Sequence, residues 1–216
     1  MPHYRDEAVV IRTHKLGEVD RIVTLLTKNH GQVRAVAKGV RKTSSRIGAR
    51  LEPFNVVDLQ LYEGRNLDTV SQVEQLANYG SVIVADYARY TAASAVVEAA
   101  ERFTREDSSS QHYMLVIGAL RALSLKEYSS DQILDSYLLR ALAISGWITN
   151  IDQCQGCAST ETVSFSVHSG SVSCQSCTMP GSVRLGVDGI SHISALLIGD
   201  WPSVGRANLA PRAAVS

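Results

Sequence analysis

The sequence lacks the features of a membrane or secreted protein. No apolar run approaches the roughly 20 residues that a helix needs to span a bilayer. The N-terminal stretch MPHYRDEAVVIRT carries charged residues where a signal peptide would need its apolar segment. We therefore expect a cytoplasmic protein with no membrane partner.

Motifs that mark common enzyme classes are also missing. The chain has no G-x-x-x-x-G-K-[ST] phosphate loop, no G-x-G-x-x-G, no H-E-x-x-H and no G-x-S-x-G. No H-x-E precedes the cysteine pairs, which argues against a zinc deaminase. The histidines follow no ligand spacing. A binding protein without enzymatic activity or a small-molecule substrate is therefore expected.

Close carboxylates near the N-terminus leave one enzymatic alternative open. Asp6 with Glu7, and Glu18 with Asp20, could hold Mg²⁺ in a metal-dependent nuclease. Solvation at strand ends is the more common role of such carboxylates. The alternative predicts cleavage of DNA that depends on Mg²⁺.

Net charge is absent as well, because 21 Lys and Arg are balanced by 21 Asp and Glu. The distribution is uneven: residues 1–50 hold 11 basic and 4 acidic residues, whereas residues 51–80 hold 1 and 5. The segment 37–50, AKGVRKTSSRIGAR, carries 5 basic residues and no acidic one. A local positive segment on a neutral chain suggests an anion-binding face, with nucleic acid as the first candidate. By charge alone, a solvated loop without a partner is an equal alternative.

The first 80 residues read as five short strands. The runs are β-branched and apolar, and Asn29-His30-Gly31 between two of them reads as a hairpin turn. Five such strands fit a small closed barrel of the OB kind, which binds single-stranded nucleic acid along a charged groove. An SH3-like barrel would show much the same pattern. The predicted strands cover residues 7–13, 21–27, 32–38, 51–62 and 67–74.

The pattern then changes to helical spacing. Apolar and small residues predict helices over 82–104, 112–126 and about 131–146, the last with a cap at Ser129–Asp131, followed by a final helix over 187–201. These helices are expected to pack as a bundle. The tail 207–216 shows no periodicity. One face of the first helix is predicted to comprise Ile83, Tyr87, Tyr90, Ser94, Val97 and Glu101.

All four cysteines lie within 24 residues, in the pattern C-x2-C-x16-C-x2-C. Two residues between cysteines allow a tight knuckle that aims both thiolates at one ion, and two knuckles complete a tetrahedron. The segment 163–172 between the pairs can form the hairpin of a zinc ribbon. The spacing predicts one structural zinc per chain, bound by Cys154, Cys157, Cys174 and Cys177.

Other roles for the cysteines are less consistent with the sequence. A redox dithiol normally comes as a single C-x-x-C on a βαβ unit, and no such unit is predicted. A disulfide scaffold is unexpected in a chain without a signal peptide. His168 lies between the pairs, but four thiolates already complete the ligand set, so a hydrated turn histidine is the better interpretation.

The order of barrel, helices, four-cysteine ribbon and final helix resembles the bacterial recombination mediator family RecO, in its actinobacterial form. The resemblance covers about residues 1–200 and is carried by local strings. These are YRDEAVVIRT at 4–13, GEVDRIVTLLT at 17–27, KGVRK at 38–42, SR at 45–46, LEPF at 51–54 and LYEGR at 61–65. Family members usually continue into one more helix, whereas the tail from Arg206 departs from that pattern.

This resemblance implies a non-enzymatic DNA repair and recombination protein, associated with the nucleoid. It implies binding and annealing of single- and double-stranded DNA, and cooperation with the ring protein RecR. It also implies binding to the acidic, apolar tail of single-strand-binding protein, so that the recombinase RecA loads on the exposed strand. The alternative is a zinc-ribbon adaptor whose basic loop binds an acidic protein, with incidental DNA binding.

Six basic side chains are the candidate DNA-binding residues. They lie on the third predicted strand and in the loop that follows it, and they are expected to contact phosphates. Phosphate contacts carry no sequence code, so binding should be largely independent of sequence. The residues are Arg34, Lys38, Arg41, Lys42, Arg46 and Arg50.

The expected fold class is therefore α+β and multidomain. An OB barrel occupies residues 1–80 and a helical domain residues 81–150. The zinc ribbon follows over 151–182. Residues 183–216 form the final helix and tail, packed with the helical domain.

Overall fold

The computed structural model describes residues 2–42, 45, 47–105 and 110–206. Its internal contacts divide the chain into two compact units, residues 1–137 and 138–216, which are considered separately below. The finer four-part division stays a prediction. The tail 207–216 and Arg46 lie outside the described residues.

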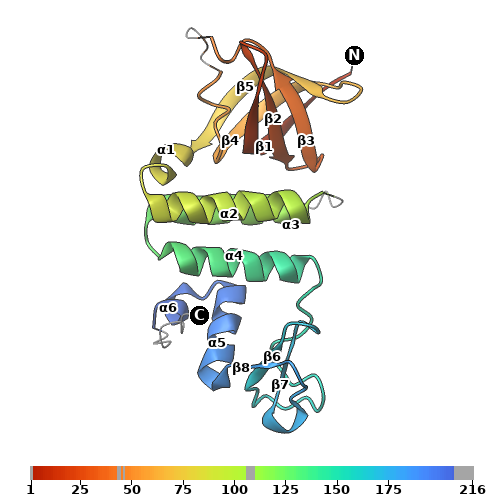
Figure 1. The fold of residues 1–216 in the computed structure, drawn as a ribbon, viewed down its shortest axis with the longest axis vertical. Coiled ribbons are helices and arrows are strands. Elements are labelled where there is room, and N and C mark those ends of the chain that lie inside the picture. Colours follow the sequence, from red (N-terminus) through yellow and green to blue (C-terminus); the bar gives the residue numbers. More distant parts are fainter. Residues whose placement is uncertain (1, 43–44, 46, 106–109, 207–216) are drawn as a thin grey trace. The chain divides into compact units, whose positions relative to one another are not determined.

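The N-terminal unit begins with a closed five-stranded barrel (Figure 1). Around the barrel the strands follow the order β1-β2-β3-β5-β4, with β1 also paired to β4. The pairs are antiparallel except β3 with β5, which is parallel. This order confirms the OB prediction and decides between the two barrels left open by the sequence. The strands are β1 (His3–Leu16), β2 (Asp20–Thr27), β3 (Gln32–Ala37), β4 (Asn55–Tyr62) and β5 (Asp68–Asn78).

Closure depends on β1, which is twice as long as predicted. Its first half pairs with β4 and its second half with β2, and a bulge between Val10 and Arg12 lets the strand bend between them. Alternate residues point into the barrel and form a buried hydrophobic core. That core comprises mainly Ala8, Val10, Val23, Leu25, Ala35, Ala37, Val57, Leu59, Leu61 and Val73.

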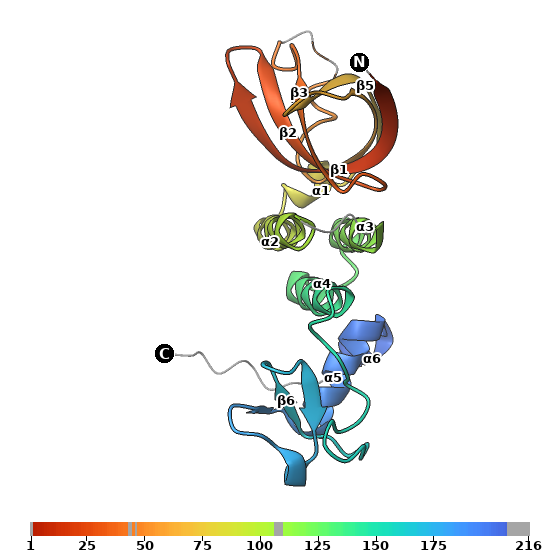
Figure 2. The ribbon, with the colours of Figure 1, turned by 90° about the vertical axis from the view of Figure 1, so that its right-hand side faces the viewer.

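Part of the outer barrel surface is also buried. Val9 and Leu26 pair across β1 and β2, point away from the barrel core, and are at most 1% exposed. Helices α2 (Tyr87–Phe103) and α3 (Ser110–Leu125) lie against β1 and β2 and explain this burial. Figure 2 shows the two helices side by side next to the barrel. Gln32 Nε2 donates a hydrogen bond of 3.2 Å to the Glu101 carbonyl and links β3 to α2.

The first predicted helix differs from the structure in two ways. It is broken into α1 (Gly80–Ile83) and α2, because Asp86 is extended and its side chain caps α2 by accepting from the Arg89 N–H. The predicted apolar face is only partly right: Ile83 and Val97 are buried, whereas Tyr87 is 83% exposed. Small residues allow closer packing against α3, and the buried face comprises Ala92, Ala93, Val96, Val97 and Ala100.

The predicted cap of the third bundle helix is confirmed. Ser129 Oγ accepts a hydrogen bond from the Gln132 N–H, and Gln132 Oε1 accepts one from the Ser129 N–H, which is a reciprocal capping box. Helix α4 (Ser130–Ile144) follows, and Gly146 lies beyond its end with a left-handed φ of 76°.

The C-terminal unit contains a small sheet and two helices. The sheet has the order β7-β6-β8, formed by β6 (Ser164–Ser166), β7 (Ser171–Ser173) and β8 (Val183–Arg184). Helices α5 (Gly186–Ile198) and α6 (Trp201–Arg206) follow, and Ala195, Leu196 and Val204 form a core with Leu139 and Trp201. In the described part of the chain, no helix is both long and apolar enough to cross a membrane.

Candidate nucleic-acid interface and metal centre

The basic loop, residues 38–54, connects β3 to β4, and its first turn is fastened to the β1–β2 turn. The Gly39 N–H donates to Asp20 Oδ1 at 2.7 Å, and the Arg41 N–H donates to the Val19 carbonyl at 2.9 Å. Gly39 has a φ of 67°, a conformation that favours glycine. These bonds hold the start of the basic loop beside strands β2 and β3.

Three of the candidate DNA-binding side chains are solvent-exposed. Arg34 lies on β3 opposite Thr24, and Lys38 and Lys42 lie in the first turn of the basic loop. Within the described ranges, none of the three makes a side-chain hydrogen bond or an ion pair. In OB folds, oligonucleotides bind the face of β2 and β3 and the loop between β1 and β2. The three cations therefore lie beside the surface that this fold commonly uses.

Two other candidates already make hydrogen bonds within the protein. Arg41 Nη1 donates to the Gly17 carbonyl at 3.0 Å, and Arg50 Nη1 donates to the Val73 carbonyl at 2.6 Å. Strand β5 pairs with β3 at Asp68 and Thr69. The Val73 carbonyl lies beyond the end of this pairing and accepts its hydrogen bond from Arg50. A guanidinium has five N–H donors, which leaves further donors on both residues. Contact of these arginines with phosphate remains a prediction.

Replacing Arg50 with alanine is expected to lower the free energy of unfolding by about 1–2 kcal/mol. A hydrogen bond from a charged donor contributes about 1.5–3 kcal/mol, and access of water to the Val73 carbonyl reduces the loss. Urea denaturation measures the change. Arg34→Ala is the matched control and should stay within about 0.5 kcal/mol of the wild type, as exposed substitutions do. Equal stabilities of the two variants would contradict the role assigned to Arg50.

Two of the carboxylates considered for a nuclease, Asp6 and Glu7, accept hydrogen bonds within the protein. The Asp6 side chain is fully buried and accepts from the Asn29 N–H at 3.0 Å, while its Oδ2 lies 2.6 Å from His30 Nδ1. Glu7 Oε2 accepts from Lys28 Nζ at 3.2 Å and from the Tyr113 hydroxyl at 3.3 Å. These bonds hold the β2–β3 turn and α3 against β1. They favour a structural role for the two carboxylates over Mg²⁺ binding.

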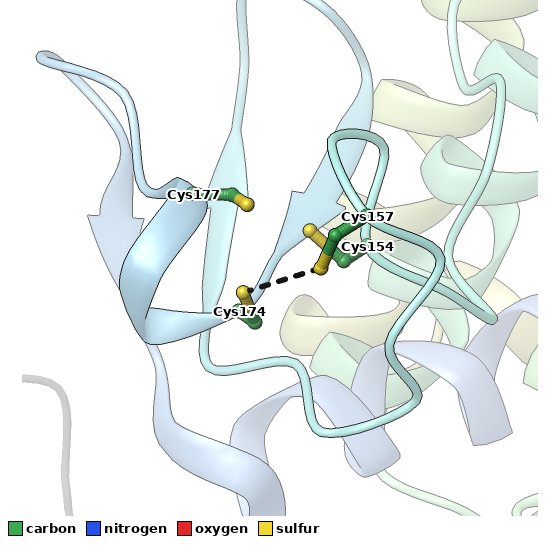
Figure 3. Close-up of side chains that lie close together, drawn as sticks. All are labelled: Cys154, Cys157, Cys174 and Cys177. Atoms are coloured by element: carbon green, nitrogen blue, oxygen red, sulfur yellow. Dashed lines mark hydrogen bonds between the residues drawn. The ribbon is translucent and has the colours of Figure 1, made fainter.

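The four cysteines converge at one point in the C-terminal unit (Figure 3). All four sulfur atoms lie within 4.8 Å of one another, and those of Cys157 and Cys174 are 3.7 Å apart. A Zn–S distance of about 2.3 Å in a tetrahedron requires sulfurs about 3.8 Å apart. All four thiols are free. The donor set and its geometry are therefore compatible with a zinc site.

Short local hydrogen bonds shape the two knuckles. In the first, the Ala158 N–H donates to the Cys154 carbonyl at 2.8 Å, and Ala158 takes a left-handed φ of 60°. In the second, residues 175–177 form one 3-10 turn (η1, Gln175–Cys177), and the Cys177 N–H donates to the Cys174 carbonyl at 3.2 Å. The Gln155 N–H donates to the Val172 carbonyl at 3.1 Å, which fastens the first knuckle to β7. The predicted hairpin between the pairs is present as β6 and β7.

The thiols differ in acidity. Backbone hydrogen bonds, chiefly from the Cys174 N–H, lower the pKa of Cys154 to about 6. Hydrogen bonds with neighbouring thiols, first with Cys174, raise the pKa of Cys177 to about 12. Several thiolates so close together repel one another, whereas a bound divalent cation would stabilise all four cysteines in the thiolate form. The donor set thus suits a cation. His168 is exposed in the β6–β7 turn and is not part of the cluster.

A side chain at Gly156 would obstruct the site. A Cβ there would lie 3.0 Å from Cys177 Sγ and 3.1 Å from Cys177 Cβ. Gly156→Ala is therefore expected to separate the knuckles and to weaken metal binding by at least tenfold, as other changes in the outer shell of metal sites do. Competition with a chelator measures the affinity. Gly205→Ala is the control, since a Cβ there meets nothing within 4 Å, and an equal affinity of both variants would contradict the prediction.

Two family models match the chain. "Recombination protein O N terminal" matches residues 1–79, which contain the barrel, and "Recombination protein O C terminal" matches residues 84–215. Together they cover almost the whole sequence.

Curated proteins that resemble the chain are named "DNA repair protein RecO". One from a Nocardioides species is 48% identical over 210 residues, which is 94% of this chain and 86% of the relative. One from Streptomyces griseus is also 48% identical over 210 residues, or 93% and 85% of the two chains. One from Bifidobacterium longum is 47% identical over 203 residues, again 93% and 85%. The likeness spans both structural units.

Proposed function

Because the chain belongs to the RecO family of DNA repair proteins, we propose that it is a non-enzymatic recombination mediator that binds and anneals DNA. The observation that carries this proposal is the exposure of Arg34, Lys38 and Lys42 beside the β2–β3 face of an OB barrel. These cations have no protein partner among the described residues and are available for phosphates. The first domain, residues 1–80, is the proposed DNA-binding part.

The proposed protein partners follow from family membership. They are RecR and the acidic tail of single-strand-binding protein, and through them RecA, which would load on the strand that is cleared. Residues 81–150 and 183–216 are the proposed helical scaffold, with the ribbon over 151–182 between them. Action in the cytoplasm, at the nucleoid, is part of the same proposal.

We also propose that Cys154, Cys157, Cys174 and Cys177 hold one structural zinc ion. Their thiolates would bind it, and the ion would neutralise them and cross-link the two knuckles. Four protein ligands leave no open position, so the ion would stabilise the ribbon and would not activate water. The proposal rests on the spacing of the four sulfur atoms.

Annealing of two complementary oligonucleotides coated with single-strand-binding protein tests the proposed function. We expect faster annealing with the protein than without it, and intact DNA after long incubation with Mg²⁺. Binding to a labelled oligonucleotide is compared with binding to an acidic, apolar peptide. Peptide binding without DNA binding would support the adaptor alternative, and cleavage with Mg²⁺ would support a nuclease.

A further inference from the structure

A pocket of about 550 Å³ lies where the basic loop ends and helices α1 and α2 begin. Its lining comes from four places in the N-terminal unit: the end of the basic loop with Phe54, the start of β4 at Asn55, the end of β5 at Asn78, and the α1–α2 segment with Val84 and Tyr90. The volume lies in the range of pockets that hold small organic groups. No sequence pattern indicates this pocket, because its residues are far apart along the chain.

Two aromatic rings form part of the lining. The Phe54 and Tyr90 ring centroids are 6.0 Å apart and the ring planes meet at 81°. Phe54 is 4% exposed, and its N–H donates to the Val10 carbonyl at 3.0 Å, so this ring is held by the barrel. Tyr90 also lines the pocket and is 46% exposed. A flat aromatic guest can therefore contact a fixed ring inside and an accessible ring at the entrance.

Asn55 supplies a polar group without a partner. Its Nδ2 donates to the carbonyls of Ala49 and Arg50 at 3.1 and 3.3 Å, and so holds the end of the basic loop. Its Oδ1 is buried and accepts no hydrogen bond from any described residue, although the side chain is only 2% exposed. A buried acceptor without a hydrogen bond destabilises the protein. A guest with an N–H donor would remove that destabilisation.

We propose that this pocket receives one unstacked nucleobase of a single strand whose phosphates lie on the basic loop. A base has a flat aromatic face for Phe54 and Tyr90 and an N–H donor for Asn55 Oδ1. The proposal rests on the proposed DNA-binding function and deepens it. Asn55 joins the two features, because its Nδ2 holds the end of the basic loop and the residue lines the pocket.

The charge at the entrance favours a base over an acidic peptide. The Glu52 side chain lines the pocket and is 49% exposed, with Arg21 Nη1 at 2.6 Å. A neutral base can pass this carboxylate without repulsion, while phosphates elsewhere on the same strand contact Lys38 and Lys42. An acidic peptide would bring like charges together.

Fluorescence anisotropy at one salt concentration tests the pocket with two probes of equal length, an oligothymidylate and an abasic strand. Tyr90→Ala should weaken binding of the oligothymidylate about 5- to 150-fold, as loss of base stacking does. Binding of the abasic strand should not change. Tyr90→Phe should bind like the wild type, and so should Tyr87→Ala, an exposed tyrosine on the same helix outside the pocket.

A second variant tests the pocket independently, in case Tyr90→Ala does not fold. Ser81 is exposed and lines the pocket, so Ser81→Phe should fill it and cause the same selective loss. Unchanged binding of the oligothymidylate by both variants would overturn the pocket proposal. The proposal would also be overturned if the pocket variants lost binding of an acidic, apolar peptide and kept DNA binding, because the pocket would then bind a protein. If Lys38→Ala/Lys42→Ala loses affinity for DNA while the pocket variants keep it, only the pocket proposal fails. If the wild type binds neither the oligothymidylate nor the abasic strand, the proposed function itself fails.

Discussion

Replacing Cys157 with serine is expected to unfold the ribbon, residues 151–182, while the barrel stays folded. Structural zinc contributes about 10–16 kcal/mol to the folding of small zinc domains. Little else can hold this ribbon, because its buried side chains are mostly polar: Thr162, Ser164, Ser166 and Ser171. Among the residues described between 151 and 182, Val172 is the one buried aliphatic side chain. Without the metal, no hydrophobic core remains to replace the lost cross-link.

Elemental analysis and hydrogen exchange measure this effect. The wild type should contain about one zinc per chain, and amides of β6 and β7 should be protected. Cys157→Ser should lose both, whereas affinity for single-stranded DNA should remain close to that of the wild type. Ser176→Ala is the matched control, since Ser176 is exposed between Cys174 and Cys177. Protected ribbon amides in a metal-free Cys157→Ser protein would show that zinc is not what holds the fold.

The double variant Lys38→Ala/Lys42→Ala is expected to bind single-stranded DNA about 10- to 30-fold more weakly at 0.1 M salt. Each lost phosphate contact reduces the slope of log K against log salt by about 0.7 on single strands and 0.9 on duplex DNA. The slope should therefore fall by about 1.4 and 1.8. Both lysines are exposed and, in the described part of the chain, their ammonium groups make no internal bond. Their removal should leave thermal stability unchanged.

Titrations at several salt concentrations measure both affinity and slope. Arg121→Ala/Lys126→Ala removes the same charge from exposed positions at the end of α3 and serves as the control. An equal loss in both double variants would reveal a general charge effect and would contradict a specific loop contact. Substitution of Arg41 is a less selective test, because its guanidinium also holds the Gly17 carbonyl.

Local sequence patterns predicted the features that depend on neighbouring residues. The C-x2-C pairs predicted both knuckles, and Ser129 predicted a helix cap that the structure confirms. Five β-branched runs predicted five strands, with ends that differ by up to a few residues. Strand β4 starts at Asn55, four residues later than predicted, because Phe54 adopts a left-handed φ of 72°. Such a conformation depends on distant contacts and leaves no local signal.

The face of α2 shows where periodicity is insufficient. Helical spacing predicted that Tyr87 and Tyr90 would face the core, but both are exposed. The buried positions are instead those of small residues such as Ala92, Ala93 and Val96. The choice depends on how closely α3 approaches, which helical spacing does not encode. The two tyrosines are thereby left accessible, and one of them lines the pocket at the end of the basic loop.

The sequence by itself determined the class of this protein: a barrel, helices and a four-cysteine ribbon, with positive charge concentrated in one loop. These features follow from residue type and spacing, which act over short distances along the chain. Only the tertiary structure decided the strand order that distinguishes an OB barrel, and which cations are available. Arg50 is partly engaged by β5, Arg41 holds the β1–β2 turn, and Lys38 and Lys42 extend into solvent. The physical reason is that hydrogen-bond partners such as the Val73 carbonyl are set by chain closure, which brings together residues far apart in sequence.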